Sequence, residues 1–487
     1  MLINLRQPKL ISLAVLALSI LLWALLQAWH DSIMPIGELA LLGILVLNIG
    51  LWLSKRKYNQ PDYIVDTLPN SRYCVENAIV KAEVAINCLN QEAKNKISES
   101  HIVSLKHQVS CLHEELNRED IHLTVTGGKS VGKTTLIKTL LSDLQTKTDK
   151  QIIFKETQPL FTEISDTAIL DDAKLADAIL FMINEDLTDT EYKTLEQLKA
   201  LKQRLILVLS RKYRYLPEEN TIILQSLQQR MSCVVVEASL FPLPVKVRKY
   251  MDSTSVQEWL EQTEPDIQQL TQRLREMIID QGERLIWATT IMKATLLYKQ
   301  TKDCLNAIRR DQAHPIIDRY QWVTGAAAFA NPIPIIDVIA TAAISGQMVV
   351  DLGEVYQQQL SLEQIKAVLE EIGGLILKLG LIEISTKAIT TILKVNAITF
   401  IAGGLVEGLS AAYLTRLAGL SLVEYFQQQE VPVMKGESLN IGKLRQALQN
   451  VFQQNKQFVF MKGFVKQGIK HLLPESAYIK PISLETE

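Results

Sequence analysis

The chain has 487 residues, long enough for two or three domains, because single hydrophobic cores rarely grow beyond about 250–300 residues. Its 51 lysines and arginines nearly balance 53 aspartates and glutamates, and a formal net charge of −2 argues against nucleic acid as a partner. A hydrophobic fraction of 47% and a mean hydropathy of +0.10 are high for a soluble protein, so we expect part of the chain to meet lipid.

Two apolar runs near the amino terminus predict a transmembrane helical hairpin within residues 1–58. The first run, residues 10–29, carries no charged side chain, and about 20 residues at 1.5 Å each match a hydrocarbon core about 30 Å thick. The second run, residues 36–53, contains one acid, Glu38, close enough to its end to reach the interface. We therefore expect two membrane crossings.

The basic residues that flank the hairpin predict its orientation. Arg6 and Lys9 precede the first run, and Lys55 and its two neighbours follow the second, so both ends are expected in the cytoplasm. A signal peptide also begins with basic residues and an apolar run, but no small-residue cleavage site follows here. The five cysteines, odd in number and without metal-ligand spacing, predict reduced thiols. The sequence thus predicts an integral membrane protein whose later domains face the cytoplasm.

Residues 59–118 are expected to form a helical linker or stalk. Their second half carries apolar residues at alternating steps of three and four: Ile102, Leu105, Val109, Leu112 and Leu116. This is the stripe of an amphipathic helix, which fits a helix packed on the next domain or a short coiled coil between two copies. We expect the first and keep a homo-oligomer formed through the helical regions as the alternative.

The segment IHLTVTG, residues 121–127, predicts a short strand that runs directly into a phosphate-binding loop. The loop reads GGKSVGKT over residues 127–134, and it matches the pattern GxxxxGK[ST] in full between an expected strand and an expected helix. A glycine turn with a chance lysine would not need that context. The expected nucleotide-binding residues of this loop are Gly127, Gly128, Lys129, Ser130, Val131, Gly132, Lys133, Thr134 and Thr135.

Each key position of the loop has a chemical reason. Gly127 and Gly132 let the backbone fold tightly, so that its N–H groups and the start of the next helix face phosphate oxygens. Lys133 is expected to reach the β- and γ-phosphates, and the Thr134 hydroxyl is expected to bind Mg²⁺. The sequence therefore predicts binding of a nucleoside triphosphate with Mg²⁺.

Apolar strand-like segments alternate with helical segments from residue 119 to residue 250. The segments AILFMIN, RLILVLS and CVVVEAS are the strands expected after the loop. Such alternation predicts a parallel sheet covered by helices, which is the α/β fold of a P-loop NTPase.

Over about residues 120–430 the chain resembles the Era-like branch of Ras-like P-loop GTPases, in particular bacterial, largely cyanobacterial, membrane GTPases with a hydrophobic C-terminal helical domain of unknown function. Besides the loop, the likeness lies in DLTDTEYKTLEQL, in YLPEE and in FANPIPIIDVIATAAISGQMVVDLGEVY. The resemblance implies GTP as the nucleotide and a bacterial inner or thylakoid-type membrane as the location.

The metal-side motif of that family is Asp-Thr-Pro-Gly, and Asp166-Thr167-Ala168-Ile169 stands in its place. The resemblance implies that Asp166 holds Mg²⁺ through water. Ile169 replaces the glycine whose N–H contacts the γ-phosphate, and a β-branched residue is stiffer at such a position. We therefore expect weakened nucleotide-dependent switching.

The guanine-recognition motif of the family, Asn-Lys-x-Asp, is replaced by Ser210-Arg211-Lys212-Tyr213. The resemblance implies that Ser210 forms a hydrogen bond to the base and that Arg211 lies along it. A tyrosine cannot replace the carboxylate that accepts from guanine. GTP stays the expected nucleotide, with ATP as the alternative.

No catalytic residue can be named from the sequence. Asp171 and Asp172 follow the metal-side motif but fit a solvated helix start equally well, and His122 fits a structural position. Thr157 and Thr162 are both candidates for the metal-ligating threonine of the first switch, and spacing does not choose between them. Hydrolysis is expected to be slow or absent, and enzymatic activity is left open.

The rest of the chain predicts an all-α hydrophobic domain over residues 262–430 and a helical tail over residues 431–487. One or two long charged helices are expected to begin at Pro265 and to end at His314-Pro315. Pro332 and Pro334 are then expected to break the following apolar segment into two helices.

Interior charges such as Asp337 and Glu407 make the helices of this domain poor membrane spans. We expect a bundle that docks on the membrane or partly enters it, with additional spans as the alternative. In the tail, the aromatic and basic segment 458–473 fits an amphipathic helix on anionic lipid or a plain solvated helix.

The leading hypothesis is a membrane-anchored GTP-binding protein whose partners are a nucleotide and a lipid membrane, and not nucleic acid. Two alternatives remain: a non-hydrolysing relative that acts as a structural membrane scaffold, and an ATP-binding relative.

Overall fold

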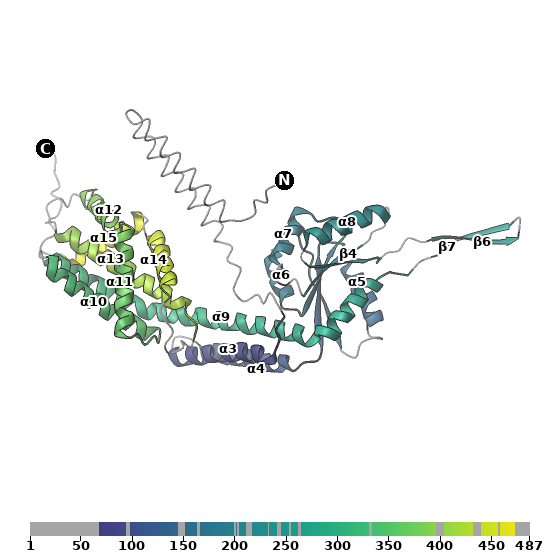
Figure 1. Cartoon of the computed structure of the whole chain (residues 1–487), viewed down its shortest axis with the longest axis horizontal. Helices are drawn as coiled ribbons and strands as arrows, with labels where there is room; N and C mark the ends of the chain where they lie inside the picture. Colours follow the sequence, from purple (N-terminus) through teal and green to yellow (C-terminus); the bar gives the residue numbers. More distant parts are fainter. Residues whose placement is uncertain are drawn as a thin grey trace, which may run out of the picture. The chain divides into compact units, whose positions relative to one another are not determined.

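The computed structural model contains a five-stranded sheet (Figure 1), and the phosphate-binding loop follows the end of one of its inner strands. Its strands are β1 (Ile121–Gly127), β2 (Ile152–Glu156), β3 (Ala178–Ile183), β4 (Leu205–Ser210) and β5 (Val234–Ala238). Their order is β2-β1-β3-β4-β5, and every pairing is parallel. The carboxyl ends of the strands therefore lie together at one end of the sheet. Open α/β sheets bind ligands beside the carboxyl ends of their strands. The expected parallel α/β fold is confirmed.

The structure describes residues 68–93, 98–144, 151–162, 166–198, 201, 204–210, 217–231, 233–240, 245–252, 255–261, 264–330, 334–395, 404–431, 440–455 and 458–472. All of them belong to one unit, Val65–Glu487. The predicted membrane hairpin within residues 1–58 lies outside the described residues, and so does Arg211. Both remain predictions.

The central strands are apolar without alternation because helices cover both faces of the sheet. Every residue of β3 and β4 is buried, as expected for parallel strands packed on both sides. The helices that follow strands β1 to β4 are α5 (Lys133–Leu144), α6 (Asp166–Lys174), α7 (Asp189–Gln197) and α8 (Pro217–Arg230). Figure 1 shows α6 and α7 on the opposite side of the sheet from α5.

One long helix, α9 (Gln268–Ala330), joins the sheet to the helical part of the chain. Its first turns, including Leu270 and Leu285, share a core with α5 and the sheet. Its later residues pack with other helices, so the helix contributes both to the predicted nucleotide domain and to the predicted hydrophobic domain. The expected end of this helix at His314-Pro315 is wrong, because α9 continues for another four turns.

Packing explains how α9 continues past Pro315. A proline inside a helix removes one hydrogen bond and crowds the preceding turn, at a cost of about 3 kcal/mol. Ala313 and Ile317 on either side of it are fully buried in a core with α10 (Pro334–Val355) and α13 (Gly404–Gln428). Burial of this stretch offsets the local cost. The predicted break at Pro332 and Pro334 is confirmed, since α9 ends at Ala330 and α10 begins at Pro334.

A buried arginine also ties the sheet to α9. Arg204, immediately before β4, donates to the Thr289 hydroxyl of α9 at 3.0 Å and to the Ala176 carbonyl at 3.3 Å. Burial lowers the pKa of its guanidinium to about 10, and the charge of the nearby Asp177 opposes that shift. Asp177 is itself buried and accepts from Arg118 at 2.6 Å. The amino edge of the sheet is thus held by a charged network.

The linker forms two helices, α3 (Arg72–Glu92) and α4 (Glu99–Leu116), that pack on α9. The apolar stripe of α4 is buried in the same core as Ala294, Leu297 and Leu305 of α9. The stripe thus packs within the chain, but on α3 and α9 rather than on the nucleotide domain that follows it. The predicted homo-oligomer through the helical regions remains a prediction.

The carboxyl-terminal part is a bundle of helices, as expected. Besides α10 and α13 it contains α11 (Leu362–Lys378), α12 (Leu381–Val395), α14 (Ile441–Asn455) and α15 (Phe458–Leu472). Among the described residues, no helix combines the length and apolar character that a membrane crossing needs.

A separate two-stranded antiparallel sheet follows β5. It consists of β6 (Val245–Asp252) and β7 (Ser255–Glu261), paired from Val245 with Glu261 to Asp252 with Ser255. Residue 250, where the nucleotide domain is expected to end, lies within β6.

The end of α3 is fixed by a buried ion pair. Arg309 of α9 is only 4% exposed, and its guanidinium donates to both carboxylate oxygens of Glu92 at 2.7 and 3.0 Å. Gln357, just after α10, donates to the same carboxylate at 2.8 Å. The pair therefore joins α3, α9 and the end of α10.

We expect Glu92→Ala to lower the free energy of unfolding by about 3–5 kcal/mol, because it leaves the buried Arg309 charge without its carboxylate. Glu76→Ala, which breaks the half-exposed pair between Arg72 and Glu76, should cost no more than about 1 kcal/mol. Urea denaturation followed by circular dichroism compares the two. Equal, small losses would mean that the Glu92 pair does not hold these helices together.

Candidate functional site

The phosphate-binding loop connects the end of β1 at Gly127 with the start of α5 at Lys133. Three of its residues have positive φ angles: Gly127 at 146°, Ser130 at 60° and Gly132 at 97°. A Cβ on Gly127 would lie 2.5 Å from the carbonyl oxygen of Met182 on β3, which no real Cβ tolerates. Gly127 is therefore required both by its conformation and by the close approach of the neighbouring strand.

The lysine of the loop folds back over it. Lys133 is 5% exposed, and its Nζ donates to the carbonyl oxygens of Gly127 at 3.1 Å and Gly128 at 2.9 Å. Burial lowers the pKa of the Lys133 ammonium, and the negative charge of Glu156 opposes this shift. The ammonium group is thus held at the centre of the loop, at the start of a helix whose first N–H groups have no intrahelical acceptor.

A carboxylate that the sequence did not single out lies beside Thr134. The Thr134 hydroxyl donates to the two carboxylate oxygens of Glu156 at 3.0 and 2.9 Å. Glu156 is the last residue of β2, which pairs directly with the loop strand, so that Val125 lies opposite Glu156. A hydroxyl and a carboxylate in contact provide two of the oxygen ligands that Mg²⁺ prefers.

Asp166, the residue expected on the metal side, is the first residue of α6. Its carboxylate accepts from the backbone N–H of Phe161 at 3.0 Å. Phe161 has a positive φ of 63°, which is uncommon for an aromatic residue. Asp166 therefore holds an unusual backbone conformation, and its role toward a metal remains a prediction.

The segment after β2 lies against the loop. The Leu160 N–H donates to the Gly127 carbonyl at 3.1 Å, and the Phe161 ring lies 3.8 Å from where a Cβ on Gly128 would stand. The Thr157 hydroxyl is buried and donates to the Thr126 hydroxyl at 2.9 Å. Thr157, one of the two threonines considered for the first switch, therefore forms a hydrogen bond with β1.

The other predicted loop residues divide by exposure. Lys129, Ser130 and Thr134 are exposed at the loop surface, whereas Val131 is buried and Thr135 is half-buried. The exposed residues can meet a ligand from the solvent side, and Val131 anchors the loop in the core with α5.

Two polar atoms at the same edge of the sheet have no hydrogen-bond partner among the described residues. One is the hydroxyl of Ser210, the fully buried last residue of β4, and the other is the side-chain oxygen of Asn184, which directly follows β3. Ile183 pairs with Leu209, so continuing the register by one residue places Asn184 beside Ser210. Unpaired buried polar atoms are costly, and a bound base could satisfy both. The sequence singled out Ser210 but not Asn184.

The acidic residues considered for catalysis are engaged at the surface. Asp171 forms an ion pair with Lys174 at 2.8 Å, and Asp172 forms one with Lys155. His122 contacts Asp120 through Nε2 at 2.6 Å. These contacts agree with solvated and structural positions.

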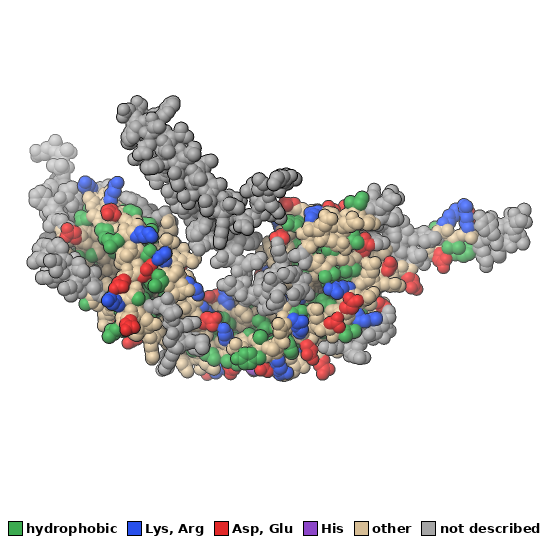
Figure 2. Space-filling model, viewed as in Figure 1, with side chains coloured by type: hydrophobic (Ala, Val, Ile, Leu, Met, Phe, Trp, Pro, Cys, Tyr) green, Lys and Arg blue, Asp and Glu red, His purple; other side chains and the backbone are tan. Residues whose placement is uncertain are grey.

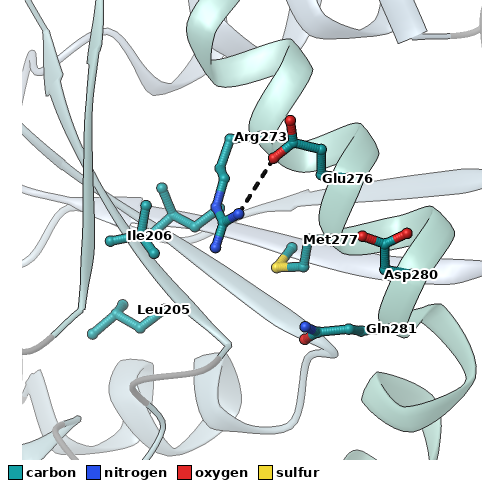
Figure 3. A pocket seen from close by; sticks show the side chains of 8 residues that line it. Leu205, Ile206, Arg273, Glu276, Met277, Asp280 and Gln281 are labelled. Carbon is teal, nitrogen blue, oxygen red and sulfur yellow. Dashed lines mark hydrogen bonds and ion pairs between the residues drawn. The ribbon is translucent and has the colours of Figure 1, made fainter.

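A small cavity lies at the opposite edge of the sheet (Figure 3). Its walls come from the first residues of β4 and β5 and from α9, whose Arg273 and Glu276 form an ion pair of 3.3 Å. Its volume is about 50 Å³, whereas small-molecule sites usually have several hundred Å³. The cavity cannot hold a nucleotide, and the loop edge remains the candidate site.

Comparison with known proteins identifies one part of the chain. Residues 292–457 match the family model "Domain of unknown function (DUF697)". The match runs from the middle of α9 past the end of α14 and agrees with the expected hydrophobic helical domain of unknown function. It covers less than half of the chain, and membership in the Era-like branch remains a prediction. No curated protein matches the chain.

Two solved structures are similar at a low level. "Crystal structure of LAO/AO transport system kinase" is 11% identical, with 60% of this chain and 100% of that chain covered and a TM-score of 0.26. "An oligomerised bacterial dynamin pair provides a mechanism for the long-range sensing and tethering of membranes" is 12% identical, with 82% and 79% covered and a TM-score of 0.24. TM-scores this low support no conclusion about the fold or function of this chain. Conclusions about both therefore rest on the geometry described above.

The two glycines of the loop allow a matched test. Gly127→Ala should abolish nucleotide binding and destabilise the protein, because its methyl group would collide with the Met182 backbone. Gly128→Ala should be tolerated in stability, since its methyl group meets only side-chain atoms at 3.7 and 3.8 Å. Melting temperature and binding of a fluorescent nucleotide measure both. A Gly127→Ala protein that behaves like Gly128→Ala would contradict this account of the loop.

Proposed function

We propose that the chain is a membrane-anchored protein that binds a nucleoside triphosphate with Mg²⁺ at the loop edge of its sheet. The observation that carries the proposal is the contact of Thr134 with Glu156 beside the Lys133 ammonium. A cation and a pair of oxygen ligands lie next to a helix start whose free N–H groups favour phosphate. This arrangement suits a triphosphate bound together with a divalent cation.

Glu156 and Thr134 are the residues that we propose as Mg²⁺ ligands. Phosphate-loop proteins hold the metal with the loop threonine or serine and with a carboxylate from a neighbouring strand, and Glu156 ends the strand next to β1. Bound Mg²⁺ would neutralise charge on the phosphates. Asp166, which the family resemblance favoured, is the competing ligand.

The role of Lys133 in the proposal is to place positive charge on the phosphates. Its carbonyl contacts in the loop can be exchanged for phosphate oxygens without moving the backbone, because the ammonium group is at the end of a flexible side chain. Lys129 and Ser130 lie at the exposed rim of the same loop.

We further propose slow or absent hydrolysis. Asp171 and Asp172, the acids that follow the metal-side motif, form surface ion pairs with lysines, and Ile169 replaces the switch glycine of the family. GTP is the proposed nucleotide through the family resemblance, with ATP as the alternative. A non-hydrolysing membrane scaffold is the second candidate, favoured by Ile169 in place of the glycine that contacts the γ-phosphate in the family.

The membrane part of the proposal rests on the apolar runs 10–29 and 36–53. They would anchor the chain in a bacterial inner or thylakoid-type membrane, with the nucleotide site on the cytoplasmic side.

Substitutions at the metal side distinguish Glu156 from Asp166. We expect Lys133→Ala to abolish binding of labelled GTP by the purified full chain. Glu156→Gln should remove the Mg²⁺ dependence of that binding, whereas Asp166→Asn should keep it, because only Glu156 contacts Thr134 in the structure. Binding is titrated with and without Mg²⁺, and phosphate release is followed on the same samples. The reverse pattern would assign the metal to Asp166, and GTP binding by Lys133→Ala would refute the proposed site.

The base side has its own test. If the unpaired Ser210 hydroxyl contacts the base, Ser210→Ala should weaken nucleotide binding by about 2- to 10-fold, the worth of one hydrogen bond. Ser421→Ala is the control, since Ser421 is equally buried but its hydroxyl already donates to Leu417. Competition between GTP and ATP on both variants shows which base is preferred. Unchanged affinity in Ser210→Ala would exclude this hydroxyl from base recognition.

A further inference from the structure

Helices α12 and α15 pack around one hydrophobic core together with α13. From α12, Ile389, Ile392 and Leu393 enter this core. From α15, the residues that enter it are Met461, Phe464, Val465, Ile469 and Leu472. Because each helix buries one side, its opposite side is turned away from the shared core.

The orientation of α15 is fixed by close packing. A Cβ on Gly468 would lie 2.3 Å from Leu409 of α13 and 3.0 Å from the ring of Trp322 on α9. The Trp322 ring stacks on Phe464 at a centroid distance of 5.2 Å and on His471 at 4.8 Å. These contacts hold the apolar side of α15 against the bundle and keep its other side at the surface.

The outer side of α15 carries a row of lysines. Lys462, Lys466 and Lys470 are exposed and four residues apart, so they lie on one side of the helix. The helix contains no acidic residue. On α12, Lys387 and Lys394 are also exposed. The two helices together contain five lysines and one acidic residue, whereas the whole chain has a net charge of −2.

Among the described residues, none of these five lysines forms an ion pair. On the neighbouring helices, by contrast, some charges are paired. Lys366 of α11 bonds Glu370, and Arg445 of α14 bonds Glu371. The positive charge on α12 and α15 is therefore left for an external partner.

Two exposed aliphatic side chains lie close to the α12 lysines along the chain. Leu377 at the end of α11 is 69% exposed, and Ile384 in the first turn of α12 is 49% exposed. Ile384, Lys387 and Lys394 follow helical spacing along one side of α12. Figure 2 shows basic, acidic and hydrophobic side chains interspersed on the visible face of the helical bundle.

We propose that this lysine surface, formed by the five lysines with Leu377 and Ile384, binds an anionic lipid bilayer. Lysines attract acidic headgroups, and the aliphatic side chains enter the boundary between headgroups and acyl chains. The exposed aliphatic groups would contribute nothing to the binding of a nucleic acid. None of the described helices has the length and apolar character that a membrane crossing needs. The bundle would lie on the bilayer, and this contact depends neither on nucleotide binding nor on the predicted hairpin.

Hydrogen–deuterium exchange on the full chain tests the proposal. The protein is studied in detergent, in phosphatidylcholine vesicles and in vesicles of equal parts phosphatidylcholine and phosphatidylglycerol. We expect α12 and α15 to exchange more slowly in the anionic vesicles only. The double variant Lys387→Glu/Lys466→Glu should lose this protection. The control Lys106→Glu/Lys138→Glu changes the net charge equally, on exposed positions of α4 and α5, and should keep it.

Each other outcome overturns the proposal. Equal exchange in neutral and anionic vesicles would mean that the chain is held by other segments. Protection already present in detergent would mean that a second copy or another part of the chain covers the surface. Protection by added RNA without lipid would assign the lysines to nucleic acid. Labelled GTP is bound to the same samples, so a failure of the nucleotide site is seen separately from a failure of the lipid contact.

Discussion

The structure depends on one continuous helix that is shared by every hydrophobic core of the described chain. The first turns of α9 complete the core of the sheet, its middle completes the core of α3 and α4, and its last turns pack with α10, α13 and α15. A helix that is buried in successive cores cannot be removed from one without loss of contacts in the next. The nucleotide site and the lysine surface therefore belong to one packed framework, and this explains why α9 tolerates Pro315.

The candidate site shows a division of labour between backbone and side chains. Gly127 and Gly132 shape the loop through conformations that other residues avoid, and the first N–H groups of α5 supply a neutral anion cradle. Two charged side chains, Lys133 and Glu156, then contact the loop and the first turn of its helix. They carry opposite charges, so a metal and a phosphate that bind together would meet both charges at once.

Local patterns in the sequence predicted the features that depend on neighbouring residues. The loop, its strand and its helix follow from GxxxxGKT, the two-sided burial of β3 and β4 follows from their continuous apolar runs, and the packing of α4 follows from its stripe. Features that depend on distant residues were missed. Glu156 became visible only when β2 was seen to pair with β1, and Asn184 only through the register between β3 and β4. The passage of α9 through Pro315 likewise required knowledge of its partners in space.

The length of α9 has a mechanical consequence. From Thr289, where Arg204 binds it, to Ala330, the helix extends about 60 Å at 1.5 Å per residue. Over that distance, one degree of tilt at the sheet displaces the far end by about 1 Å. Because Arg204 holds α9 near the amino ends of the strands, a small tilt of the helix there is amplified along its length. A tilt of a few degrees would move the carboxyl-terminal helices by a few ångströms.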